Sequence, residues 1–465
     1  METQGIPTVT LTRTDFVGVM KNAVTGLGLA PDAAMVTFPI DMFLPGSDLA
    51  PLRARKREFY DGLTRWQSGF AQDAAGAATM LSVEGASYED ALNKANNLLI
   101  TNLWGDGLPL WPATRERVDW ILRGAALPRA HAIGKFPPRG GVTTVETCAV
   151  ALAMAGGRPE YLPVLIAAVE AFLDAESESD QLQATSGGPF PVVIVNGPIA
   201  QEIRLNSGFG CLGPDPQRPA GASIGRALRL LQQNVGGALP GVGTMAIFGA
   251  MRYTNAVFAE DEAALPQGWQ PHATVRHGYA PGTNSVSLVF ASGVTNVRRR
   301  GAKKETQQED VLSGMWRMAD FMRTPNLAAL AGYEKGTPGI MMISPVVAKM
   351  MAELGWTQPS IRQFLWENSK IPLAQLKRAG APAWFEIDAN PVTRESIRLD
   401  PWPIALKPEN IVLVVAGGDH PTHSHWLQAH SPRVIGRVMR VPESFDRLLA
   451  DADRDLGCGT DACRI

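Results

Sequence analysis

Two spacings of apolar residues alternate along this 465-residue chain, one typical of helices and one of buried strands. Near the start, IPTVTL, DFVGVMKNAVTGLGL and AAMVTFPI predict a strand, a helix and a strand. Further short apolar runs predict strands at TMLSVEG, PVVIVNGP, SVSLVFAS, GIMMIS and NIVLVVAGG. Continuous apolar runs are typical of strands covered on both faces, as in parallel sheets.

Helical spacing fills the intervals between these strands. Ser87 is a suitable N-cap for the first long helix, and glycines follow several of the others. The predicted helices are SYEDALNKANNLLITNLW, TVETCAVALAMAGG, EYLPVLIAAVEAFLDA, ASIGRALRLLQQNVGG, SPVVAKMMAELG, QPSIRQFLWENSKI and PESFDRLLADADRDLG. This alternation predicts an α/β fold with mostly parallel sheets flanked by helices.

The length and a charged stretch at 45–66 indicate more than one lobe. We expect a small α/β segment at 1–60 and a central α/β domain with a glycine-rich loop at 61–330. A C-terminal α/β domain is expected at 331–456, followed by a flexible cysteine tail at 457–465. No sequence repeat is found.

Composition excludes some classes of partner. Apolar residues make up 45% of the chain, charged residues 19%, and the formal net charge is −2. No global field therefore attracts nucleic acid or anionic membrane. The first residues lack a basic segment followed by an apolar core, and no run of eighteen apolar residues occurs, so we expect a cytoplasmic protein without membrane segments.

The stretch GFGCLG matches the glycine spacing of dinucleotide-binding loops. Its context argues against NAD, because no strand directly precedes it and prolines prevent a helix directly after it. One alternative is a tight turn. The other is a ligand-binding loop in which Gly208 and Gly210 let the backbone approach a substrate, with Asn206 and Ser207 as polar contacts and Cys211 as the thiol.

Three of the seven histidines lie in GGDHPTHSHW, directly after a predicted strand. Loops at the carboxyl ends of strands commonly carry the chemistry of α/β proteins. His420, His423 and His425 are therefore candidate ligands of a divalent metal. A single histidine acting in acid–base catalysis, with His423 the first candidate, and a plain surface loop are the alternatives.

Half of the four cysteines, Cys458 and Cys463, lie in the last eight residues. Four residues separate them, too many for a C-x-x-C helix motif but few enough for a disulfide ring. A dithiol near a free chain end could reach an interior disulfide and then an external reductant. The alternative is two idle thiols, since a metal site would need a second ligand pair nearby.

Other candidate residues lie at predicted helix ends. Cys148 is the second choice for the active-site thiol, because a helix N-terminus lowers the pKa of a thiol, although its apolar neighbours fit a buried structural cysteine equally. Asp106, Arg158 and Glu160 are candidate substrate-binding residues, and helix capping or ion pairing would explain them as well.

The tail CGTDAC resembles the C-terminus of the large subunit of class I ribonucleotide reductases. That resemblance implies a shuttle role for Cys458 and Cys463, with thioredoxin or glutaredoxin as the external reductant. It covers about ten residues, and the rest of the chain does not look like a reductase barrel.

The body resembles bacterial proteins that accompany or fuse to small UGSC-motif (seleno)proteins. The similar stretches include NLLITNLWGDGLPLWPATRERVDWIL, IVNGPIAQEIRLNSGFGCLGP and LVVAGGDHPTHS. GIPTVTLTRTDF is similar to the part of those proteins that follows the redox motif, and to the selenoprotein subunit of glycine reductase. The U/C-G-S-C motif itself is absent, and Pro345, Val346 and Val347 replace an expected Pro-Glu-His element.

Together these features predict a thiol-dependent oxidoreductase, or its catalytic subunit, that reduces a small organic substrate or a substrate–thiol adduct. Its partners would be thioredoxin or glutaredoxin and a small UGSC-type redox subunit, and we expect an oligomer. One rival hypothesis is a metal-dependent hydrolase or lyase using the histidine loop. The other is a non-catalytic scaffold for a small redox protein.

Overall fold

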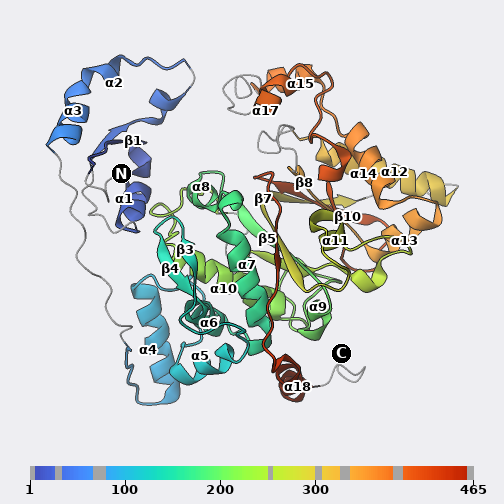
Figure 1. The fold of residues 1–465 in the computed structure, drawn as a ribbon, viewed down its shortest axis with the longest axis horizontal. Coiled ribbons are helices and arrows are strands. Elements are labelled where there is room, and N and C mark those ends of the chain that lie inside the picture. Colours follow the sequence, from blue (N-terminus) through green and yellow to red (C-terminus); the bar gives the residue numbers. More distant parts are fainter. Residues whose placement is uncertain are drawn as a thin grey trace.

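The computed structural model describes residues 6–26, 34–44, 46–65, 80–249, 255–298, 306–324, 336–380 and 391–457. Helices and strands alternate through these residues, as the apolar pattern predicts (Figure 1). None of the described helices combines the length and the apolar composition needed to cross a bilayer. Most of the predicted cysteine tail, including Cys458 and Cys463, lies outside the described residues.

The strands are β1 Thr10–Arg13, β2 Met35–Phe38, β3 Ala132–Phe136, β4 Gly141–Thr144, β5 Phe190–Asn196, β6 Ala256–Ala259, β7 Ser285–Arg298, β8 Gly339–Ile343, β9 Val412–Val415, β10 His423–Ala429 and β11 Ile435–Val438. The helices of the first half are α1 Val17–Gly26, α2 Ala50–Ala54, α3 Lys56–Thr64, α4 Tyr88–Thr101, α5 Arg115–Leu122, α6 Val145–Met154, α7 Leu162–Phe172, α8 Ser179–Ala184, α9 Ile199–Glu202 and α10 Ala220–Asn234. Those of the second half are α11 His272–His277, α12 Gln307–Met322, α13 Pro345–Glu353, α14 Gln358–Asn368, α15 Leu373–Arg378, α17 Pro391–Ser396 and α18 Phe445–Leu456.

Several helices begin where side-chain caps allow. The Ser87 side chain accepts a hydrogen bond from the backbone of Asp90 at the start of α4, as predicted. Thr144, Thr306 and Thr357 form capping boxes at the starts of α6, α12 and α14. Each cap satisfies backbone N–H groups that have no partner within the first helical turn.

The N-terminal strands form a sheet of their own. β1 and β2 pair in parallel, and α1 lies between them along the chain. A Cβ atom placed on Gly18 of α1 would lie 3.6 Å from the Cα of Val242, so this segment touches the turn that follows α10. A second small sheet pairs β3 with β4.

The main sheet has seven strands in the order β6-β5-β7-β10-β8-β9, with β11 paired to β7. The predicted mostly parallel arrangement is wrong for this sheet. β5–β6 and β8–β9 are parallel pairs, whereas β7 is antiparallel to β5, β10 and β11, and β10 is antiparallel to β8. The apolar runs misled the prediction because antiparallel strands covered on both faces are also continuously apolar.

Two units of the same connectivity make up this sheet. In the first, β5 leads through helices to the parallel β6, and β7 returns antiparallel to β5. In the second, β8 leads through helices to the parallel β9, and β10 returns antiparallel to β8. β7 pairs with β10 and joins the units. The structure therefore contains an internal duplication that the sequence does not reveal, and the boundary predicted near residue 330 separates strands of one sheet.

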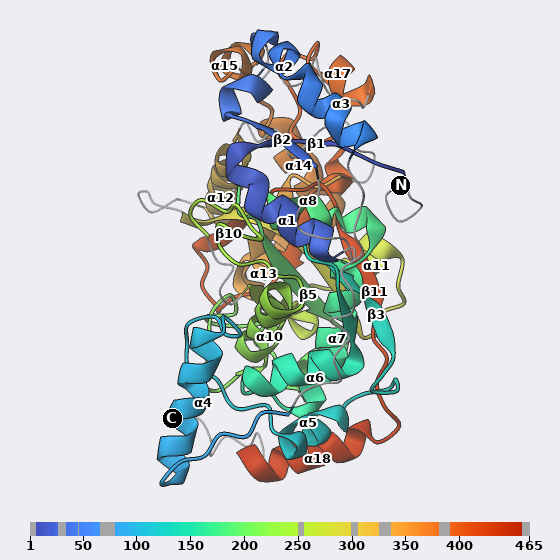
Figure 2. The same ribbon diagram turned by 90° about the vertical axis from the view of Figure 1, so that its left-hand side faces the viewer.

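Three apolar cores follow from the alternation of side chains along these strands. Val193 and Val195 of β5 face a core formed with α6, α7 and α10, while Met341 and Ile343 of β8 face a core formed with α12, α13 and α14. The residues between them, such as Ile194, point to the inner face of the curled sheet, where the third core lies. Figures 1 and 2 show the two helical groups on opposite sides of the sheet.

Two local predictions fail. The run TMLSVEG forms no strand in its described residues, 80–85, which are mostly exposed. The second half of the predicted histidine loop is strand β10, which lies between β7 and β8 in the middle of the sheet. The apolar pattern did not predict β10 because this strand contains polar residues. A strand whose inner face borders a cavity does not need an apolar side chain at each inward position.

The corner where β5 and β6 end is filled by buried polar side chains. Glu260 is 4% exposed, and its Oε2 accepts hydrogen bonds from Asn196 Nδ2 at 2.7 Å and from the His272 backbone at 2.6 Å. Its Oε1 has no hydrogen-bond partner among the described residues. Burial raises the pKa of Glu260 to about 7, and the charge of Glu262 adds to the rise.

This raised pKa predicts a pH-dependent stability. Because the folded-state pKa of Glu260 lies above the unfolded value of 4.5, the wild-type protein loses stability as pH rises through about 7. Glu260→Gln keeps the shape and an acceptor but removes the charge. We expect the variant to gain on the order of 2–3 kcal/mol relative to wild type between pH 5 and pH 8. Urea unfolding at both pH values measures this, and a constant difference would contradict it.

Candidate functional site

A cavity of about 410 Å³ lies at the corresponding corner of the second unit, where β8 and β9 end and β10 begins. The strand registers make Ser344 equivalent to Asn196, and Ala416 equivalent to Glu260. The smaller side chains leave open the corner that is filled in the first unit. The cavity is lined by Gly208, Gly210, Cys211, Leu212, Gly213, Pro214, Asn296, Met342, Ser344, Ala416, Gly417, Gly418, His423, Ser424 and His425.

The glycine-rich loop bridges the two edge strands of the curled sheet at this cavity. The Asn206 carbonyl accepts a hydrogen bond from the Ala259 backbone at the end of β6, at 3.0 Å. The Ser207 carbonyl accepts one from the Gly417 backbone just after β9, at 2.7 Å. Asp261 N also donates directly to the Val415 carbonyl, so the two edges meet here.

Asn206 braces this loop and does not line the cavity. Its side chain is 3% exposed; Nδ2 donates to the Phe209 carbonyl at 2.8 Å and to Asp215 at 3.0 Å. Oδ1 accepts from the Gly208 backbone at 2.8 Å. Ser207 contributes its backbone carbonyl rather than a side chain, while Gly208 and Gly210 form part of the cavity wall, as expected for a ligand-binding loop.

Gly418 lies against a side chain of the glycine-rich loop. A Cβ atom there would lie 2.1 Å from the Phe209 ring, which covers this position from the opposite loop. Gly417 has φ +105°, a conformation that side chains disfavour. These two glycines therefore let the glycine-rich loop and the segment after β9 lie against each other.

Cys211 belongs both to the inner core and to the cavity wall. Its residue is 7% exposed, and burial raises the pKa of its thiol to about 12. The thiol is consequently protonated at neutral pH. It differs from a resting thiolate of the kind found at helix N-termini, and would need a base to become a nucleophile.

His423 and His425 occupy alternate positions of β10, so both side chains are on the cavity face. His425 lies between Met342 of β8 and Asn296 of β7 in the register. Burial lowers the pKa of both histidines, and for His423 the charges of His420 and Arg298 lower it further. Both imidazoles are therefore neutral at pH 7 and able to accept a proton.

His420 turns toward His423 instead of joining a three-histidine cluster. Nδ1 of His420 and Nδ1 of His423 are 3.0 Å apart, and Thr422 Oγ1 is 3.0 Å from each. In the part of the chain that the structure describes, no group of three His, Cys, Asp or Glu side chains has a spacing that could hold a metal ion. The predicted site of His420, His423 and His425 is therefore not brought together in the described residues: His420 turns to His423, and His425 lies two positions further along β10.

The remaining predicted residues lie elsewhere and have structural partners. Cys148 is fully buried on α6, and burial raises its pKa. Asp106 forms a two-pronged ion pair with Arg226, at 2.8 and 2.9 Å. Arg158 donates to Glu160 at 2.6 Å, so these two form the ion pair that was the alternative to substrate binding.

Sequence reasoning missed the contributions of β7 and β8 to the cavity. Asn296, Met342 and Ser344 lie far along the chain from the glycine-rich loop, and only strand pairing brings them together. A weak signal exists in the small residue that ends the run GIMMIS and in the glycines after NIVLVVAGG. Comparisons with protein-family models, curated proteins and solved structures found no match to this chain.

The burial of the two internal thiols predicts how they react. At pH 7 we expect iodoacetamide to alkylate Cys211 slowly, with the rate rising about tenfold per pH unit up to about pH 10, because the thiolate fraction rises in that proportion below a pKa of about 12. Cys148 should react only after unfolding. Mass spectrometry of peptides at timed intervals measures both rates, and rapid alkylation of Cys211 at pH 7 would contradict the raised pKa.

The two thiols also differ in their expected effect on stability. Cys148→Ser places a hydroxyl in an apolar core and should cost about 1–3 kcal/mol of the free energy of unfolding. Cys211→Ser is the matched control, since the cavity leaves room for water at its hydroxyl, and should cost less. Urea unfolding of both variants decides, and equal losses would show that the cavity does not relieve the buried hydroxyl.

Proposed function

We propose that this protein is a thiol-dependent oxidoreductase that reduces a small, uncharged substrate–thiol adduct in this cavity. The observation that supports the proposal best is that Cys211 shares one cavity with His423 and His425, although more than 200 residues separate the loop from β10. Thiol chemistry needs at least a nucleophile and a base, and here Cys211 and a neutral histidine of the same cavity would serve in these two roles.

The cavity wall favours an uncharged substrate. Among the described lining residues there is no Asp, Glu, Lys or Arg, and the lowered histidine pKa values leave the imidazoles neutral. A charged substrate would lose its hydration without gaining an opposite charge. The glycine backbone and the side chain of Asn296 supply hydrogen bonds, while Met342 and Leu212 supply apolar contact.

The first step is an exchange between the Cys211 thiol and the S–S bond of the adduct. A cavity imidazole takes the thiol proton as the sulfur attacks, and the adduct's S–S bond breaks as the Cys211–substrate disulfide forms. The imidazolium then returns the proton to the departing thiolate. A protonated resting thiol protects the enzyme from oxidation until a substrate fills the cavity.

The second step returns Cys211 to its thiol. One cysteine of the Cys458–Cys463 pair attacks the Cys211–substrate disulfide and releases the substrate as a thiol. The other tail cysteine then displaces Cys211, which leaves a Cys458–Cys463 disulfide. An external dithiol protein of the thioredoxin or glutaredoxin type reduces that disulfide, so two electrons and two protons enter for each S–S bond cleaved.

Disulfide probes of matched size test the charge preference and the role of Cys211. We expect bis(2-hydroxyethyl) disulfide to form an adduct on Cys211 about tenfold or more faster than cystamine or dithiodiglycolate, because only the neutral probe avoids the desolvation cost of a charge. A double variant, Cys458→Ser with Cys463→Ser, makes the adduct persist for mass spectrometry. Cys211→Ser in that background is the control.

The same probes decide between chemistry and a binding role. If His425→Ala slows adduct formation on Cys211 while the pH dependence flattens, the imidazole serves as the base. Equal rates for all three probes would contradict the uncharged substrate class. Absence of any Cys211 adduct in the folded protein would overturn the proposed function.

A further inference from the structure

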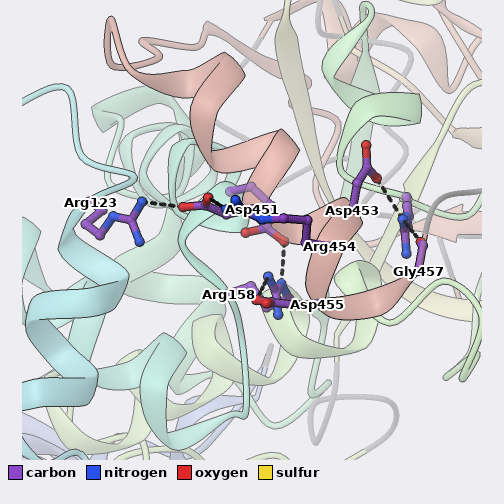
Figure 3. A network of polar contacts seen from close by, with 9 residues as sticks. Arg123, Arg158, Asp451, Asp453, Arg454, Asp455 and Gly457 are labelled. Carbon is purple, nitrogen blue, oxygen red and sulfur yellow. Dashed lines mark hydrogen bonds and ion pairs between the residues drawn. The ribbon is translucent and has the colours of Figure 1, made fainter.

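The last helix, α18, is attached to the body in two ways. Phe445 and Leu448 are buried in the core of the first unit, and Ala452 is buried as well. Three aspartates of α18 also pair with arginines from three separate segments of the body; Figure 3 shows Asp451 beside Arg123 and Asp455 beside Arg158. The pairs are Arg123–Asp451 at 2.5 Å, Arg204–Asp453 at 2.8 Å and Arg158–Asp455 at 2.9 Å.

Arg204 makes a contact that the other two arginines do not make in this network. Its Nη2 also donates to the carbonyl of Gly457 at 2.6 Å. That carbonyl belongs to the peptide bond leading directly into Cys458. A guanidinium at the C-terminal end of a helix is favoured by the partial negative charge there. Arg204 thus fixes the point from which the cysteine tail departs.

The backbone at Arg204 is in a conformation that favours glycine. Its φ is +57°, and the Leu205 backbone donates to the Ala200 carbonyl at 2.8 Å, which closes the end of α9. Glycine commonly occupies such a position, and another residue there costs about 1 kcal/mol. The arginine side chain, through Asp453 and Gly457, supplies the compensating contacts.

The same residue begins the chain segment that carries the thiol. Cys211 is the seventh residue after Arg204, a path of at most about 25 Å if extended. The path is shorter in the structure, because Asn206 Nδ2 donates to the Phe209 carbonyl and Cys211 N donates to the Gly208 carbonyl. Cys463 lies six residues beyond Gly457, a reach of about 20 Å.

From these contacts we infer that Arg204 is a positioning residue that holds the origin of the dithiol tail beside the loop carrying Cys211. The inference rests on the proposed function of Cys458 and Cys463. Fixing one end of a short tether near its target raises the effective concentration of the tail thiols at Cys211. Releasing that end lets the tail spread over a larger volume and slows the exchange.

Disulfide trapping in the full-length protein tests the inference without a substrate. The reduced protein receives one equivalent of bis(2-hydroxyethyl) disulfide, and mass spectrometry follows the Cys211–tail disulfide in a Cys463→Ser background, in which Cys458 cannot be resolved. Arg204→Gln should slow this disulfide about fivefold or more. Arg204→Lys, which keeps a cation, should restore part of the rate. Arg123→Gln, which breaks an equivalent ion pair on α18, should leave it unchanged.

Two internal readouts separate positioning from loss of structure. The rate at which the probe itself modifies Cys211, and the free energy of unfolding, should be the same within about twofold and about 1 kcal/mol for the Arg204 and Arg123 glutamine variants. Equal trapping rates in wild type and Arg204→Gln would overturn the positioning role alone. If the Cys463→Ser protein with Arg204 intact forms a Cys211–probe adduct but no Cys211–tail disulfide, the tail shuttle fails and the positioning role fails with it.

Discussion

The antiparallel pairing of β7 with β10 is the interaction on which the rest of the structure depends. It joins two units of equal connectivity into one sheet, and each unit supplies one group of covering helices. The pairing also contributes to the cavity, because it places His425 opposite Asn296 at the open corner of β8 and β9. The equivalent corner of β5 and β6 is filled around Glu260.

The two units have the same connectivity but different side chains at equivalent corners, so one corner of the sheet is filled and the other is open. In the first unit Oε2 of the buried Glu260 accepts hydrogen bonds from Asn196 and a backbone amide, Oε1 has no partner among the described residues, and burial raises the pKa. In the second, Ser344 and Ala416 occupy the equivalent positions and remove bulk and charge. The lining of the resulting cavity carries no Asp, Glu, Lys or Arg side chain among the described residues.

Segment 204–214 contacts three parts of the structure. Its start binds the end of α18, its middle bridges the edges of β6 and β9, and its end contributes Cys211 to the cavity. A short, internally hydrogen-bonded segment transmits position well, because few torsions remain free between its two ends. The ion pairs on α18 are partly exposed and therefore contribute little free energy. Burial of Phe445 and Leu448 provides most of the free energy that holds α18 on the body, and the arginines help to set the position of the helix.

The sequence by itself determined the local elements. Spacing and capping predicted α4, α6 and α10 and the strand β5, because hydrophobic period and helix caps act within a few residues. It also identified Cys211 and His423 as chemically notable. Only the tertiary structure decided strand direction, the repeated strand connectivity, the identity of β10 as a strand and the position of Cys211 and His423 on one cavity, since these depend on pairing between distant segments. The tertiary structure also showed that Cys148 and Glu160 have structural surroundings. Cys148 is buried, which raises its pKa, and Glu160 forms an ion pair with Arg158.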